Sequence, residues 1–133
     1  MNIPRGARVR IITSWILVVL LALGYLAAAA GKLAGAATET FANWGYPAWF
    51  ATLIGVLELA GAIGLLIPKT MRYAVLGLTA VMIGAAYTHL ANNEGLQVVR
   101  PAVFLALLWT AWWLRQTPAA ARRDVDERSR NKA

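Results

Sequence analysis

The chain has 133 residues, of which 59% are hydrophobic and only 14% are charged, and it contains one histidine and no cysteine. Without cysteine there is no internal disulfide framework, dithiol redox centre or thiolate-bound metal, and a single histidine excludes bis-histidine haem ligation within one chain. The net charge of +7 would suit nucleic acid, but the basic residues flank long apolar runs, so we predict a polytopic membrane protein with no nucleic-acid partner.

Four apolar segments predict four transmembrane helices, at about residues 11–32, 48–67, 73–91 and 96–114. Each is close to the roughly 20 residues that cross about 30 Å of hydrocarbon. The start of the fourth is ambiguous, because Pro101 to Leu114 is too short alone, whereas a start near Gly95 places Arg100 inside the span. A cleaved signal peptide is the alternative for the first run, but that run exceeds the usual length of about 7–15 apolar residues and further spans follow.

The segment between the first two spans, residues 33–47, is rich in aromatic residues. It carries Phe41, Trp44 and Tyr46, with Trp49 just beyond. Aromatic side chains at this density are typical of the headgroup boundary, so we predict a short interfacial helix and interpret these residues as membrane anchors. The predicted fold is all-α: a polytopic membrane four-helix bundle over residues 1–115, with this interfacial segment between spans 1 and 2.

The distribution of basic residues predicts the orientation. Of the 13 Lys and Arg residues, only Lys32 and Arg100 fall on the side opposite the termini. Because positive charge is retained in the cytoplasm, we predict a cell (inner) membrane protein with both termini cytoplasmic. Residues 116–133 form a basic tail that we expect to be disordered or to lie on anionic lipid headgroups; a tail that only sets topology is the simpler alternative.

Glu58 is the charged residue that most needs an explanation, because it lies ten residues into the second predicted span, about 15 Å deep. Its helical neighbours include four small residues, Ala51, Gly55, Gly61 and Ala62. Small residues lie where another helix approaches closely, so Glu58 is predicted to face the bundle interior and to need a partner.

Four further polar residues are predicted to converge with Glu58 in the outer half of the bundle: Tyr25, Lys32, His89 and Arg100. Tyr25 lies on the same helix face as Lys32 and about 10 Å deeper in the membrane. Lys32 can extend its flexible side chain toward Glu58. Each also has a simpler structural interpretation. Lys32 and Arg100 could be snorkelling end residues, His89 an interfacial histidine, and the buried charges a structural ion pair.

One carboxylate, one imidazole and two cations could bind a polarised carbonyl or a quinone head group and exchange a proton with it. In this hypothesis Glu58 and His89 are catalytic, and Tyr25, Lys32 and Arg100 bind the substrate. No metal site is predicted, because Glu58 and His89 are too few ligands. The residues fix no cofactor, and a quinone is the candidate that they would suit.

Several stretches of the chain resemble the DoxX-like family of small four-helix membrane proteins. They are Gly31-Lys32-Leu33, Gly45-Tyr46-Pro47, the run from Ile54 through Glu58 to Pro68, and Gly84-Ala85 followed by Thr88-His89. The resemblance covers about residues 10–115. It implies a four-helix bundle whose polar cluster uses positions 32, 58 and 89, and a redox-associated function; Arg100 is supported by topology more than by the family pattern.

Two hypotheses from different classes follow. The first is a polar pocket in the outer half that binds or converts a small lipophilic molecule, quinone-like or isoprenoid-like. The second is a non-catalytic membrane subunit that assembles with itself or with a redox partner, suggested by small-residue pairs such as Ala60 with Gly64 and Ala80 with Gly84. Transport is disfavoured, because the inner half offers only Thr79 as a polar residue.

Overall fold

The computed structural model describes residues 3–133, with the side chains of all of these except residues 117–124. All regular structure in this part is helical, in the order α1 (Arg5–Leu33), α2 (Thr38–Asn43), α3 (Phe50–Leu66), α4 (Met71–Ala91), η1 (Gly95–Val98) and α5 (Val99–Asn131). The 11 charges that set the predicted orientation include residues 122 and 123, whose side chains lie outside the described ones.

Three of the helical segments are long and apolar enough to cross a membrane: Arg5–Leu33, Met71–Ala91 and Gly95–Gln116. α3 is equally apolar but has 17 residues, about 26 Å of helix, which is at the short end of what a bilayer requires. The segment Gly95–Gln116 corresponds to the fourth predicted span, and it begins at Gly95, the earlier of the two starts considered for that span. Pro101 then lies in the first turn of α5, where its missing N–H costs no helical hydrogen bond.

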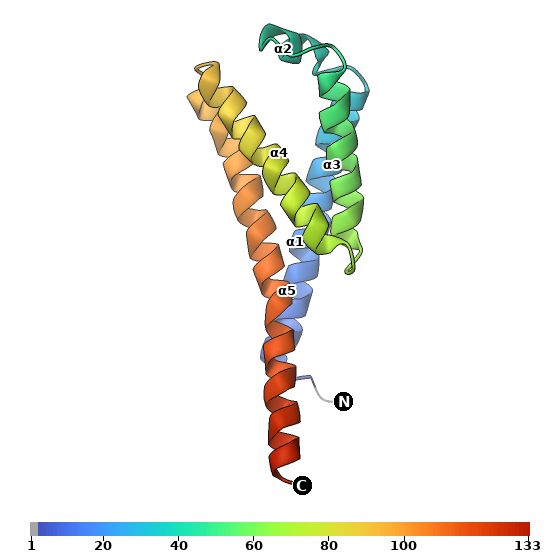
Figure 1. The fold of residues 1–133 in the computed structure, drawn as a ribbon, viewed down its shortest axis with the longest axis vertical. Helices are drawn as coiled ribbons and strands as arrows, with labels where there is room; N and C mark the ends of the chain where they lie inside the picture. Colours follow the sequence, from blue (N-terminus) through green and yellow to red (C-terminus); the bar gives the residue numbers. More distant parts are fainter. Residues whose placement is uncertain (1–2) are drawn as a thin grey trace.

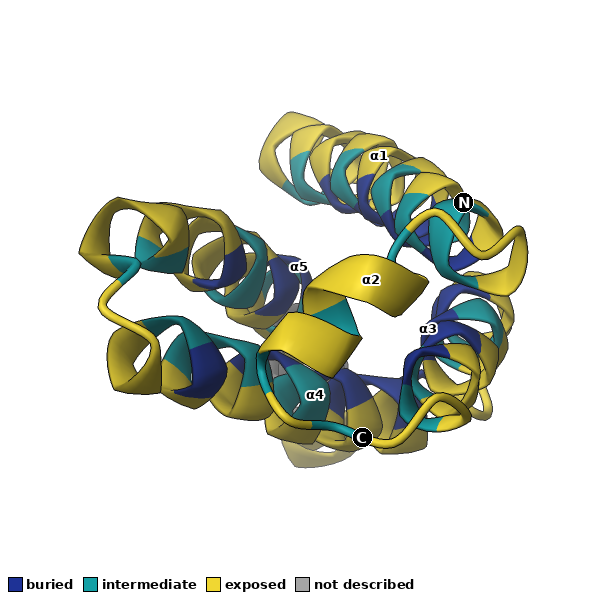
Figure 2. Cartoon of the chain, turned by 90° about the horizontal axis from the view of Figure 1, so that it is seen from above, coloured by how far each residue is buried: buried dark blue, intermediate teal, exposed yellow. Residues whose placement is uncertain are grey.

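The four long helices pack as a ring in which α1 contacts α3 and α5, and α4 contacts α3 and α5. Both termini lie at one end of this ring, which we call the terminal end (Figure 1). At the other end, which we call the α2 end, α4 and α5 diverge from α1 and α3 (Figure 1). α2 lies across this wider end (Figure 2). The predicted short helix between the first two spans is therefore present.

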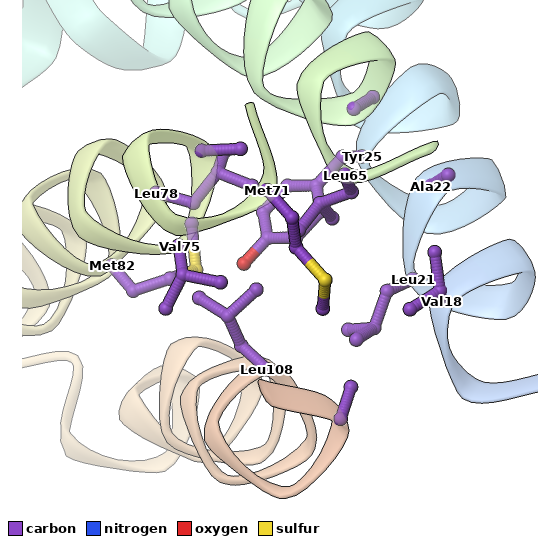
Figure 3. Packing of buried hydrophobic residues seen from close by; sticks show 13 residues of the cluster. Val18, Leu21, Ala22, Tyr25, Leu65, Met71, Val75, Leu78, Met82 and Leu108 are labelled. Atoms are coloured by element: carbon purple, nitrogen blue, oxygen red, sulfur yellow. The ribbon is translucent and has the colours of Figure 1, made fainter. Parts of the chain in front are cut away.

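The core lies between the helices in the half toward the terminal end. Buried positions recur at spacings of three and four residues on each helix, so that each long helix presents one stripe to the others. Leu65, Leu78 and Leu108, from α3, α4 and α5, are almost completely buried and meet Val18 of α1 in one cluster (Figure 3). This half of the ring is filled by side chains.

Two cation–π contacts join α1 and α5 near the terminal end. The Arg10 guanidinium lies 4.9 Å from the centroid of Trp113, and the Arg115 guanidinium lies 4.0 Å from that of Trp15. Each helix thus contributes one arginine and one tryptophan. Contacts of this kind are favourable where an indole face is partly shielded from water, so they hold the two helices together beyond the core.

Residues 116–131, for which we expected disorder or a position on the lipid headgroups, are described as the continuation of α5 to Asn131. The composition explains this: alanine and arginine have high helix propensity, and both dominate positions 119–123. Arg128 and Arg130 lie in the last turn, where a positive charge interacts favourably with the helix dipole.

Candidate functional site

The close contact between α1 and α3 positions the two deepest charges. A Cβ atom added to Gly55 of α3 would lie 3.1 Å from Lys32 Cβ and 3.4 Å from the Ala29 carbonyl oxygen. A larger residue would push these atoms apart by a few tenths of an ångström, so the glycine favours the close approach of the helices beside the site. Ala51, Gly55, Glu58 and Ala62 are all buried on one face of α3, which confirms that the small-residue face of Glu58 is directed into the protein.

Lys32 and Glu58 form an ion pair across this contact. Lys32 Nζ lies 2.9 Å from Glu58 Oε2, and the two side chains are 19% and 4% exposed. The pair was among the contacts that depth along the helices predicted. Within the described residues, Glu58 Oε1 and two of the three ammonium hydrogens of Lys32 make no further hydrogen bond. The pair consequently keeps both acceptor and donor capacity.

A cavity of about 1320 Å³ adjoins this ion pair at the α2 end. Its volume exceeds the roughly 300–1,000 Å³ of typical small-molecule sites. Most of its lining is apolar and small, and comes from α1, α2, α3, α4 and the segment that joins α4 to α5. The polar lining residues include Lys32, Glu58, Thr88, His89, Glu94 and Arg100.

Arg100 lines the cavity from the first turn of α5. Its side chain is exposed and makes no hydrogen bond or ion pair with the described residues. Four of the five predicted site residues, Lys32, Glu58, His89 and Arg100, therefore share one cavity.

Tyr25 is the exception, because it belongs to the core and not to the cavity lining. Its side chain is 1% exposed, and its ring packs edge-on against Phe104 with 5.0 Å between centroids. The hydroxyl lies among apolar side chains (Figure 3) and has no hydrogen-bond partner in the described chain. Tyr25 therefore does not join the other predicted site residues in the cavity, because at this depth the helices are already tightly packed.

His89 is paired with Glu94 rather than with Glu58. His89 Nδ1 lies 2.7 Å from Glu94 Oε2, and Trp44 Nε1 donates to Glu94 Oε1 at 3.3 Å. These hydrogen bonds, first that from His89 and then that from Trp44, hold the pKa of Glu94 below the ordinary value for a glutamate. Because the Glu94 carboxylate accepts a hydrogen bond from Nδ1–H of His89, Nε2 is the ring nitrogen that stays free.

The turn after α4 explains how Glu94 reaches His89. Asn93 adopts a left-handed φ of 60°, and the Glu94 N–H donates to the His89 carbonyl at 2.8 Å. Together with the bond from the Asn93 N–H to the Leu90 carbonyl, this is a Schellman motif. It returns the chain over the last turn of the helix. The signal for it in the sequence is the Asn92-Asn93 pair directly after an apolar helical run, which the analysis of transmembrane charges missed.

The aromatic residues near α2 pack on one another and line the cavity. Phe41 contacts Trp44, Tyr46 and Phe50, and the Tyr46 and Phe50 rings are stacked with 4.5 Å between centroids. Because Thr88 Oγ1 donates to the Gly84 carbonyl, the Tyr46 hydroxyl donates to Thr88 Oγ1, at 2.8 Å. Trp49, by contrast, is 62% exposed, as expected of an anchor. Tyr46 and Trp44 thereby tether the α2 segment to α4 and to the turn after it.

Comparison with known proteins assigns the family. A family model described as the DoxX-like family matches residues 16–111. The chain belongs to the DoxX-like family. The match includes α2, α3, α4 and most of α1, and therefore Lys32, Glu58, His89 and Arg100.

One curated relative of this DoxX-like protein is the uncharacterized protein YdgD of Bacillus subtilis (strain 168). The two sequences are 36% identical over 56 residues, which are 39% of this chain and 49% of the relative. The matched part thus spans about half the length of that relative. No solved structure matches the chain. Together with the apolar helices, the family identifies a membrane protein.

Proposed function

We propose that this DoxX-like protein binds a small lipophilic molecule in the cavity at the α2 end, with the polar head of the ligand at Lys32 and Glu58. The observation that carries the proposal is a buried ion pair with unused hydrogen-bonding capacity in the wall of a large, mainly apolar cavity. A charge pair of this kind is costly within a membrane, and its position on a cavity is typical of a binding role.

The chemistry of the pair favours a head group with both acceptor and donor oxygens. A carbonyl oxygen would accept from Lys32 Nζ or Arg100, and a hydroxyl would donate to Glu58 Oε1. A quinone and its quinol offer these two groups in turn. Their interconversion consumes or releases two electrons and two protons, so a membrane redox partner would exchange the electrons while Glu58 and His89 exchange the protons.

The same proposal includes the topology. Four helices, with α3 as the shortest span, would form a membrane four-helix bundle in the cell (inner) membrane. Both termini would be cytoplasmic and the cavity would lie in the outer half, because Lys32 and Arg100 are at the α2 end and the other basic residues flank the terminal end. Binding from the outer half of the bilayer would then be the accessible route.

The subunit alternative has less support, because the residues that motivated it have roles within the chain. A Cβ at Gly64 would lie 3.0 Å from Ala74 Cβ, so Gly64 serves the contact between α3 and α4. Ala80 and Gly84 line the cavity. Self-assembly through Ala80 and Gly84 would therefore compete with a ligand in the cavity.

A titration with a tail-free quinone tests the binding site. We expect 2,3-dimethoxy-5-methyl-1,4-benzoquinone to bind the purified protein in lipid nanodiscs, measured by calorimetry. Glu58→Gln removes the charge at constant shape and is expected to weaken binding at least tenfold. Glu39→Gln is the matched control, because Glu39 lies on α2 outside the cavity lining. Absence of binding, or equal affinity for the two variants, would overturn the proposal.

A further inference from the structure

A second, smaller cavity adjoins the first along the contact between α3 and α4. It has a volume of about 280 Å³ and is lined only by residues of these two helices and the turn between them. Leu57 and Gly77 line both cavities. The smaller space therefore begins where the first cavity ends and reaches Thr70, and we call it the α3–α4 groove.

The groove is open toward the surroundings of the protein. α3 and α4 are joined by a short turn near the terminal end and diverge toward α2 (Figure 1). Leu57 is 45% exposed, and Gly77, Ala80 and Gly84 are also exposed along α4. A Cβ added to Gly77 or Gly84 would meet nothing within 4 Å. In a membrane, this side of the cavity faces lipid.

The surface of the groove is apolar and its floor is tight. A Cβ at Gly61 would lie 2.5 Å from Leu78 Cδ2, so the two helices touch at the bottom. The Thr70 hydroxyl at the far end already donates to the Gly64 carbonyl at 3.0 Å. The other polar lining residue, Tyr73, is exposed, and its hydroxyl accepts from Arg72 at 2.7 Å. The rest of the lining is apolar, and a space of about 280 Å³ admits a hydrocarbon chain but not a helix, which is about 10 Å across.

We infer that the ligand carries a long apolar tail, that it enters sideways from the bilayer between α3 and α4, and that its tail lies in the α3–α4 groove toward Thr70. This inference rests on the proposed function, because the head group is placed at Lys32 and Glu58. The occupant is an amphiphile with one polar ring and one hydrocarbon chain. An apolar tail in an apolar groove open to lipid adds affinity through packing and specificity through length.

Two quinones that differ only in the tail test the inference. They are the tail-free benzoquinone ring and the same ring with a decyl tail, titrated in nanodiscs with the affinity of the tailed compound corrected for partition into the lipid. We expect the tail to tighten binding about tenfold. Ala60→Leu should abolish this gain and leave the affinity for the tail-free ring within twofold, because Ala60 is exposed and lines the groove but not the cavity that holds the head group.

The matched control is Ala106→Leu, which makes the same substitution at an exposed position of α5 that lines neither cavity. It should keep the full gain from the tail. Both variants should elute and melt like the parent protein, since both substituted positions are exposed. If the ring binds and Ala60→Leu retains the tail gain, the inference is wrong and the proposed function stands. If the ring does not bind the parent protein, both are wrong.

Photolabelling gives a readout that does not depend on affinity. A decyl tail with a terminal diazirine should label the α3–α4 groove, at residues such as Leu57, Gly64 and Ala74, and excess unlabelled compound should reduce that labelling at least fivefold. Labelling confined to the outward faces of α1 and α5, unaffected by competitor, would show that the tail only dissolves in lipid and would overturn the inference.

Discussion

The terminal end and the α2 end of the helix ring use similar residues for opposite purposes. Toward the terminal end, Leu65, Leu78 and Leu108 fill the space between the helices, and reciprocal arginine–tryptophan contacts join α1 to α5. Toward the α2 end, small residues line a cavity that no side chain fills. Small residues on a helix permit close packing where the helices converge, and they leave open space where the helices diverge.

The two ends also differ in the elements that hold their polar side chains in place. Lys32 and Glu58 are fixed by two long helices packed around Gly55. Glu94, Trp44 and Tyr46 are held by turns and by the six-residue α2. A short helix with few buried contacts is stabilised mainly by its tethers, so it opens more easily than the helices beneath it. We therefore expect substitutions at the ion pair to affect the whole protein and substitutions at Glu94 to act locally.

The largest effect is expected for Lys32→Met, which leaves the Glu58 carboxylate, 4% exposed, without a partner. Removing one member of a buried pair costs about 3–5 kcal/mol. Glu58→Ala should cost less, because Lys32 is 19% exposed and its ammonium can extend to the aqueous boundary. Apparent unfolding temperatures in detergent measure the difference.

The double variant Lys32→Met/Glu58→Leu serves as the control for these two substitutions. It should recover most of the stability lost in Lys32→Met, because no buried charge remains unpaired. Equal losses in Lys32→Met and Glu58→Ala would show that the unpaired Glu58 carboxylate is not the source of the larger cost.

The next prediction compares the same substitution, glycine to alanine, at one position where the helices converge and at one where they diverge. Gly61→Ala should destabilise the protein by about 1–3 kcal/mol, because the added methyl group would overlap Leu78. Gly84→Ala should stabilise it by up to about 1 kcal/mol, because the new Cβ meets nothing within 4 Å and alanine is the better helix former. Thermal melts of the pair under one condition suffice, and a loss at Gly84 would contradict the open cavity.

A smaller effect, of opposite sign to most substitutions, is expected for Tyr25→Phe. The Tyr25 hydroxyl is buried without a hydrogen-bond partner in the described chain, and an unsatisfied buried polar group costs about 1–3 kcal/mol. Its removal at constant ring packing against Phe104 should therefore leave stability unchanged or raise it, and should leave quinone affinity within twofold. A destabilised variant would show that the hydroxyl contributes a bond to the native state.

The features that could be predicted from the sequence are those that depend only on the helical period and on depth along the helix. The small residues around Glu58 indicated its inward face, and depth indicated Lys32 as its partner. Depth does not reveal where helices converge, so it placed Tyr25 at the site although the helices are packed at that level. It also overlooked Glu94, since the contact with His89 depends on a left-handed Asn93 in a turn. The prediction for the tail after residue 115 rested on charge and left helix propensity out, so it did not include the continuation of α5.

The smallest and most local effect concerns the tether of α2 through Glu94. Its pKa is lowered by the hydrogen bond from His89 and then by that from Trp44. A lowered folded-state pKa means that the tether is fully present above the ordinary glutamate pKa, and that it is lost as the pH falls through the lower, folded-state pKa. Acidification should therefore release α2 locally while α1, α3, α4 and α5 stay packed.

Because the chain has no cysteine, two introduced cysteines can report on this release without interference. Spin labels at Glu39→Cys on α2 and Leu90→Cys on α4, both exposed positions, should give a narrow distance distribution at pH 6.5 that broadens as the pH is lowered through the folded-state pKa of Glu94. Adding Glu94→Ala should produce the broad distribution over this whole pH range, because the acceptor for Trp44 and His89 is gone. A second label pair on α1 and α3 should stay narrow throughout. If Glu94→Ala leaves the α2–α4 distribution narrow, α2 is held by Tyr46 and the aromatic cluster, and the two ends of the molecule differ less in rigidity than their contacts indicate.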